Sequence, residues 1–171
     1  SHRVHGCALT QYAILPRYLW YSVDSTTCWR AASNGSFVVP QVRVHGTKIE
    51  YDYAGHPYWF PCTERRASAS SNIHKQGELY QKIVREYVAS LGFDFDTAKE
   101  NYVLRNAISF HYFYQLSQQL SARKNYPFLF YTSGRPAGSS VAAIQALLKH
   151  IEGWGCKELN YLGTFADLRT Y

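Results

Sequence analysis

The hydrophobic pattern of this chain changes near residue 66, and that change constrains its fold more than any other feature. Before residue 66, the segments 38–44 and 47–53 are rich in β-branched and aromatic side chains, which is typical of strands. His45-Gly46 lies between these segments and predicts a tight turn, so we expect a β-hairpin. Shorter strands are expected at residues 8–14, 18–23 and 56–60. Residues 1–66 are therefore predicted to form an antiparallel, β-rich part.

After residue 66, apolar residues recur at the spacing of helices. One stripe comprises Ile73, Tyr80, Ile83, Val84, Tyr87, Val88 and Leu91. Gly92 follows this stripe at a position where glycine commonly ends a helix. Asp96-Thr97, with Glu100 three residues after Thr97, predicts the start of a second helix that extends to about Ser121.

The last part of the chain has the pattern of a β-α-β unit. Residues 127–131 form a short apolar run that predicts a buried strand, and residues 132–140 predict a loop rich in Gly and Ser. Residues 141–151 carry an apolar helical stripe, and residues 159–162 are expected to form the returning strand. We therefore predict an α+β fold. It would be a single domain of 171 residues, with a β-rich part at 1–66 followed by two long helices and the β-α-β unit in 67–171.

Four cysteines, Cys7, Cys28, Cys62 and Cys156, are widely spaced and lack the C-x-x-C spacing of zinc sites. Their even number predicts two disulfides, a disulfide-stabilised fold and secretion, whereas four buried thiols in a cytosolic protein are the alternative. Asn34-Gly35-Ser36 is an acceptor triplet for N-glycosylation and also favours secretion. No apolar stretch reaches the roughly 18–20 residues of a membrane span, and no signal peptide is recognised. We expect a mature, secreted form without a transmembrane segment.

The chain carries 18 Lys and Arg against 12 Asp and Glu, a net charge of +6. Such a balance favours anionic partners such as nucleic acids, nucleotides, acidic glycans or lipid headgroups without selecting one of them. Motifs for dinucleotides and for the phosphate-binding loop of nucleotide hydrolases are both missing, so no cofactor is predicted. His2 and His5 could chelate a metal near the chain end, but we predict no metal site.

The loop at residues 132–140 is the first candidate site, because it joins a predicted strand to a predicted helix. Backbone N–H groups at the start of a helix attract anions. Arg135 could bind a phosphate, sulfate or carboxylate through two hydrogen bonds. We expect Ser133, Arg135, Ser139 and Ser140 to bind an anion. The alternative is an ordinary connection in which a serine caps the helix.

The second candidate site combines His56, Glu64 and Arg66. A histidine, a carboxylate and a cation are sufficient for metal-independent cleavage of RNA: one group takes the 2′-hydroxyl proton, another protonates the leaving oxygen, and the cation stabilises the charged phosphorus centre. These three residues are therefore the predicted catalytic set of a ribonuclease. The alternative is that His56, which lies between Gly55 and Pro57, is only a turn residue.

These observations predict a secreted effector or toxin-like protein that recognises an anionic or phosphate-bearing target, with action on RNA or a nucleotide as its sharper form. The sequence leaves open whether the protein is an enzyme. The alternative is a non-catalytic secreted or surface module that grips a protein or glycan through exposed aromatic side chains. Candidates for that surface are Trp20, Trp29, Tyr58 and Trp59.

Overall fold

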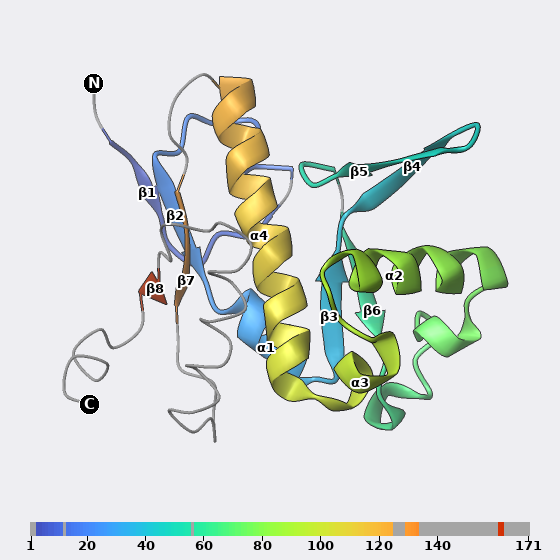
Figure 1. Cartoon of the computed structure of the whole chain (residues 1–171). Helices are drawn as coiled ribbons and strands as arrows, with labels where there is room; N and C mark the ends of the chain where they lie inside the picture. Colours follow the sequence, from blue (N-terminus) through green and yellow to red (C-terminus); the bar gives the residue numbers. More distant parts are fainter. Residues whose placement is uncertain (1–2, 12, 56, 125–128, 134–160, 163–171) are drawn as a thin grey trace.

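A computed structural model describes residues 3–11, 13–55, 57–124, 129–133 and 161–162 of the chain (Figure 1). The described residues form a mixed structure of α-helices, one parallel sheet and two antiparallel strand pairs. This arrangement confirms the α+β prediction in its coarse form.

The parallel sheet unites strands from both ends of the chain. Its order is β1 (His5–Gly6), β2 (Ser22–Ser25), β7 (Leu129–Ser133) and β8 (Tyr161–Leu162), and all three neighbouring pairs are parallel. The parallel pairing of β7 with β8 agrees with the expected β-α-β unit, whose predicted helix lies outside the described residues. The pairing of β2 with β7 was not predicted, because the first strands were expected to be antiparallel.

Two antiparallel pairs lie beyond this sheet. β3 (Ser36–Val39) pairs with β6 (Tyr58–Pro61), and β4 (Gln41–His45) pairs with β5 (Lys48–Asp52). The predicted hairpin is confirmed as β4–β5. Its turn is Gly46-Thr47 rather than the predicted His45-Gly46, because His45 pairs with Lys48, and Gly46 has a φ of 62°. Its first arm is shorter than predicted because Pro40, which has no N–H to donate, separates β3 from β4.

Residues 8–14 were predicted to form a strand, and that prediction is wrong. Backbone hydrogen bonds there are local, because Ile14 and Leu15 both donate to the carbonyl of Gln11. A short helix that the sequence analysis missed, α1 (Thr27–Ser33), follows β2 directly. The segment before β3 is therefore less β-rich than its composition suggested.

The first predicted helix is confirmed in its main part. Two 3-10 turns, η1 (Glu64–Arg66) and η2 (Ile73–Lys75), precede α2 (Glu78–Ser90). Gly92 has a φ of 84°, a left-handed conformation that favours glycine, and the chain turns away from α2 there.

The second predicted helix is two helices, α3 (Phe95–Glu100) and α4 (Tyr102–Lys124). The side chain of Asp94 accepts a hydrogen bond from Thr97 N and caps α3, so the start lies before the predicted capping box. Asn101 has extended backbone angles and breaks the helix. Its Oδ1 accepts from Val103 N at 2.9 Å and begins α4.

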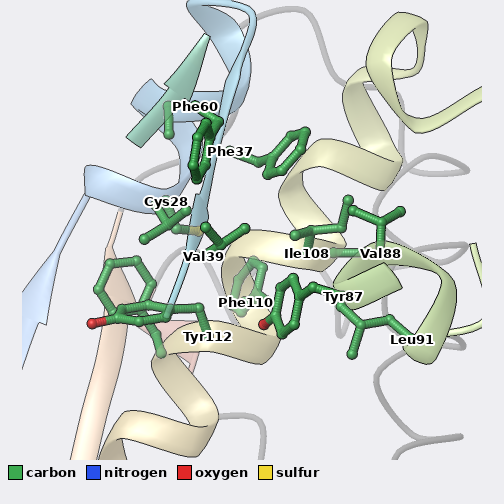
Figure 2. Packing of buried hydrophobic residues seen from close by; sticks show 14 of the residues in the cluster. Cys28, Phe37, Val39, Phe60, Tyr87, Val88, Leu91, Ile108, Phe110 and Tyr112 are labelled. Atoms are coloured by element: carbon green, nitrogen blue, oxygen red, sulfur yellow. The ribbon is translucent and has the colours of Figure 1, made fainter. Parts of the chain in front are cut away.

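Helix α4 lies at the centre of the molecule, between the parallel sheet on one side and β3, β6, α2 and α3 on the other (Figure 1). Its Ile108 and Phe110 belong to one buried cluster with Phe37 and Val39 of β3 and with Val88 of α2 (Figure 2). Burial of such side chains is the main favourable contribution to folding.

A buried arginine on α4 holds three helices together. The guanidinium of Arg105 donates to Ala32 O from Nε at 3.1 Å and from Nη2 at 3.0 Å, and to Lys99 O from Nη1 at 2.7 Å. These carbonyls belong to the last turns of α1 and α3, where a positive charge is favourable. Burial lowers the pKa of Arg105 from its ordinary value, yet the side chain stays charged.

The prediction of two disulfides is not borne out by the described cysteines. No disulfide joins Cys7, Cys28 or Cys62, and Cys156 lies outside the described residues. Cys28 and Cys62 are instead buried in the apolar core. Among the residues that the structure describes, no helix is long and apolar enough to cross a membrane.

Substitution of Arg105 by methionine, which keeps much of the volume, should lower the free energy of unfolding by about 2–3 kcal/mol, because Ala32 O and Lys99 O lose charge-assisted hydrogen bonds. Urea unfolding monitored by circular dichroism measures this. Arg17→Met, at an exposed position, is the control and should cost less than about 0.5 kcal/mol. Equal stability of both variants would contradict the role given to Arg105.

Candidate functional site

The carboxyl edge of the parallel sheet is the best candidate for a functional site. It comprises the ends of β1, β2, β7 and β8, at Gly6, Ser25, Ser133 and Leu162. Because all four strands are parallel, their carboxyl ends lie at the same edge. In open parallel sheets, ligands bind outside the carboxyl ends of the strands.

Three hydroxyl groups meet at the end of β2. Ser25 Oγ donates to Thr27 Oγ1 at 2.6 Å and accepts from Thr27 N at 3.0 Å. Thr27 Oγ1 in turn donates to Thr10 Oγ1, from the connection after β1, at 3.4 Å. We call Thr10, Ser25 and Thr27 the hydroxyl cluster. Ser25 is buried and the two threonines are partly exposed, so the cluster reaches the surface at this edge.

A second group of polar side chains comprises His5 on β1, Cys7 directly after β1, and Ser22 and Asp24 on β2. His5 Nε2 lies 3.2 Å from Asp24 Oδ1, and His5 Nδ1 lies 2.8 Å from Ser22 Oγ. The register pairs His5 with Ser22 and Gly6 with Val23, and Cys7, the residue after β1, lies close to Asp24. One ligand atom each from His5, Cys7 and Asp24 lies within 4.8 Å of the other two.

The backbone after Cys7 is held in an unusual conformation. Ala8 has a φ of 52° and is the only described non-glycine residue with a positive φ. Its N–H donates to Asp24 Oδ1 at 3.0 Å, and Leu9 N donates to Asp24 O at 3.0 Å. A left-handed alanine persists only where surrounding contacts hold it. Both contacts here go to Asp24, so the position of Cys7 beside Asp24 is fixed.

One of the predicted anion-binding residues lies at the same edge. Ser133 is the last residue of β7, and the register pairs its neighbour Thr132 with Ser25. Arg135, Ser139 and Ser140 lie outside the described residues and stay predictions. The predicted loop therefore begins beside the connection from β2 to α1.

The predicted catalytic residues lie elsewhere. Glu64 and Arg66 are exposed on η1, and Arg66 Nε donates to Asn34 O at 3.1 Å, at the end of α1. Because α1 begins at the carboxyl edge and is about 10 Å long, η1 is at its far end. His56 lies outside the described residues. The structure therefore does not bring Glu64 and Arg66 to the carboxyl edge, and their catalytic role stays a prediction.

The aromatic candidates for a binding surface are largely packed. Trp29 is buried and contacts Phe110 edge to face with ring centroids 5.2 Å apart, so the expectation that it is exposed is wrong. Trp20, Tyr58 and Trp59 are partly buried and pack against the core. Trp29 is therefore not part of such a surface, and Trp20, Tyr58 and Trp59 expose only part of their side chains.

Two buried titratable groups are held in their neutral forms. Burial raises the pKa of the Cys62 thiol to about 12, although the charge of Arg105 opposes the shift, so Cys62 is not a nucleophile at neutral pH. Burial also lowers the pKa of His111 to about 4, and its Nδ1 lies 3.1 Å from Tyr87 OH. His111 is thus neutral at pH 7.

Asp24 and the hydroxyl cluster were not predicted as site residues, and Cys7 was predicted only as a disulfide partner. A sequence signal for this site was present. The polar run Asp24-Ser25-Thr26-Thr27 directly follows a segment with a strand pattern, just as residues 132–140 follow the apolar run at residues 127–131. The helix after it was too short to show an apolar stripe.

Comparisons with protein-family models, with curated proteins and with solved structures return no significant match.

Protonation of His111 should make stability depend on pH. The unfolded chain binds a proton below its pKa of about 6.5, whereas the folded chain does so only near pH 4, so stability is lost as pH falls through this window. We expect the free energy of unfolding to fall by about 2 kcal/mol between pH 7 and pH 5 from this group.

Urea unfolding at the two pH values measures the effect. The variant His111→Gln should lose most of this dependence, whereas the control His45→Gln, on the exposed turn of β4–β5, should keep it. The same pH dependence in all three proteins would show that His111 is not the responsible group.

Proposed function

We propose that this chain binds an anionic, phosphate-bearing ligand at the carboxyl edge of its parallel sheet. One observation carries the proposal: the paired central strands β2 and β7 both end in hydroxyl residues, at Ser25 and at Thr132-Ser133, and both lead into polar connections. Ligands of open parallel sheets bind outside the carboxyl ends of the strands.

The chemistry of the described residues supports this ligand class. The partly exposed hydroxyl of Thr10 can donate to a phosphate oxygen, and Thr27 orients it by donating to Thr10 Oγ1. The net charge of +6 favours approach of an anion. Arg135, two residues after the end of β7, would supply a charge-assisted contact.

A secreted effector or toxin-like protein remains our hypothesis for the biological class. The disulfide argument for secretion no longer supports it, since Cys7, Cys28 and Cys62 form none. The exposure of Asn34 in its glycosylation triplet is consistent with it. Cleavage of RNA is a more specific hypothesis, and it depends on His56, Glu64 and Arg66 as the catalytic set. Because Glu64 and Arg66 lie on η1, away from the carboxyl edge, a cleaved RNA would have to reach both places.

Binding can be measured by fluorescence anisotropy with a fluorescein-labelled oligoribonucleotide of mixed sequence. We expect Arg135→Ala to weaken binding by about tenfold or more, because a charge-assisted hydrogen bond contributes about 1.5–3 kcal/mol. Thr27→Val should weaken binding by about fivefold, because the isosteric change removes one hydroxyl. Unlabelled ATP and heparin as competitors distinguish a nucleotide from an acidic glycan.

Matched controls remove the same groups at exposed positions outside the hydroxyl cluster. Arg17→Ala removes one positive charge from the connection between β1 and β2, and Thr47→Val removes one exposed hydroxyl from the hairpin turn. Both should bind like the unmodified chain. If Arg17→Ala and Arg135→Ala weaken binding equally, the interaction is a general effect of charge and the proposed site is wrong.

A further inference from the structure

Within the described residues, the side chains of His5, Cys7 and Asp24 make a set of nitrogen, sulfur and oxygen ligands at the β1–β2 end of the sheet. We propose that they bind one zinc ion. The inference goes beyond the proposed anion binding and is independent of it.

The distances suit a tetrahedral metal. Zinc bonds of about 2.0–2.3 Å place neighbouring ligand atoms about 3.3–3.8 Å apart. His5 Nε2 and Asp24 Oδ1 are already 3.2 Å apart, and all three ligand atoms lie within 4.8 Å of one another. Cys7 is exposed, so rotation of its side chain can close the remaining distance.

Ser22 orients the histidine as an outer partner of a metal ligand would. Metal-binding histidines usually hydrogen-bond through the second ring nitrogen, which fixes the ring and its tautomer. Ser22 is buried and its Oγ lies 2.8 Å from His5 Nδ1. When Ser22 Oγ accepts this bond, the lone pair of Nε2 faces the carboxylate of Asp24, an arrangement that a bound cation stabilises.

The left-handed backbone at Ala8 is a separate observation that points to the same place. The turn is tied to Asp24 through Ala8 N and Leu9 N, and it holds Cys7 beside the carboxylate. Strained residues of this kind cluster at ligand-binding sites. The arrangement of Cys7 therefore exists before any metal arrives, which favours affinity.

The ligand types select the metal. A thiolate and an imidazole favour zinc over magnesium, which prefers oxygen ligands. Three protein ligands from the described residues leave a fourth position for water or a ligand, as in catalytic zinc sites.

The test uses the full chain without a histidine tag, stripped with a chelator and dialysed against zinc in the presence of excess magnesium. Elemental analysis should find about one zinc per chain. Substitution by cobalt should give the near-ultraviolet charge-transfer band of a cobalt–thiolate bond. Cys7→Ser and Asp24→Asn should each lower zinc affinity by more than about tenfold, and Ser22→Ala by about tenfold.

Matched variants separate this site from other chelation. His45→Ala alters an exposed histidine whose Nε2 lies 4.0 Å from Glu50 Oε2, outside the three-ligand set, and should leave zinc binding unchanged. Circular dichroism of each stripped variant shows whether it is folded, and Cys7→Ser, at an exposed position, keeps the test decisive if Asp24→Asn unfolds. No zinc above background in the unmodified chain, no cobalt–thiolate band, or loss of zinc in His2→Ala but not in Cys7→Ser would overturn the proposal.

Discussion

The parallel pairing of β2 with β7 is the constraint on which the rest of the structure depends. It joins Ser22–Ser25 to residues 129–132, and α1, both antiparallel pairs and α2 to α4 all lie in the connection between the two strands. Closing so long a connection carries an entropic cost. The cost is offset by the core around α4, whose side chains contact the elements on both sides. Arg105 holds the ends of α1 and α3 against α4 through its hydrogen bonds to Ala32 O and Lys99 O.

The position of the candidate site follows from this pairing. Ser25 and Ser133 are distant in sequence, but the register of this pairing places the ends of β2 and β7 side by side. The outer strand β1 brings Cys7 to the same edge, where Asp24 holds the following backbone. The anion site and the zinc site that we propose thus lie near each other on the same sheet, although they use different residues and are tested separately.

The sequence predicted elements whose signals are local. Gly92 at the end of α2 and Gly46 in the hairpin turn both need a positive φ, and both were located correctly. The break at Asn101 was missed because the apolar pattern continues through it and only a side-chain cap separates α3 from α4. The β2–β7 pairing was missed because no local pattern specifies a partner so distant in sequence.

The disulfide prediction failed for a related reason. An even number of widely spaced cysteines does not show whether any two of them lie close together in the fold, and the presence of Cys28 and Cys62 is explained by their burial in the core. For the site, residues 132–140 were predicted from composition, whereas Cys7 and Asp24 become neighbours only through the register.

The central claim is that ligands bind at the carboxyl edge of the parallel sheet, and amide chemical shifts test it most directly. A ¹⁵N-labelled chain titrated with the oligoribonucleotide should show its largest shifts at the hydroxyl cluster, Thr10, Ser25 and Thr27, and at Ser133, while the β4–β5 hairpin stays unchanged. Saturable shifts confined to Glu64–Arg66 or to the hairpin, with none at the carboxyl edge, would contradict the account.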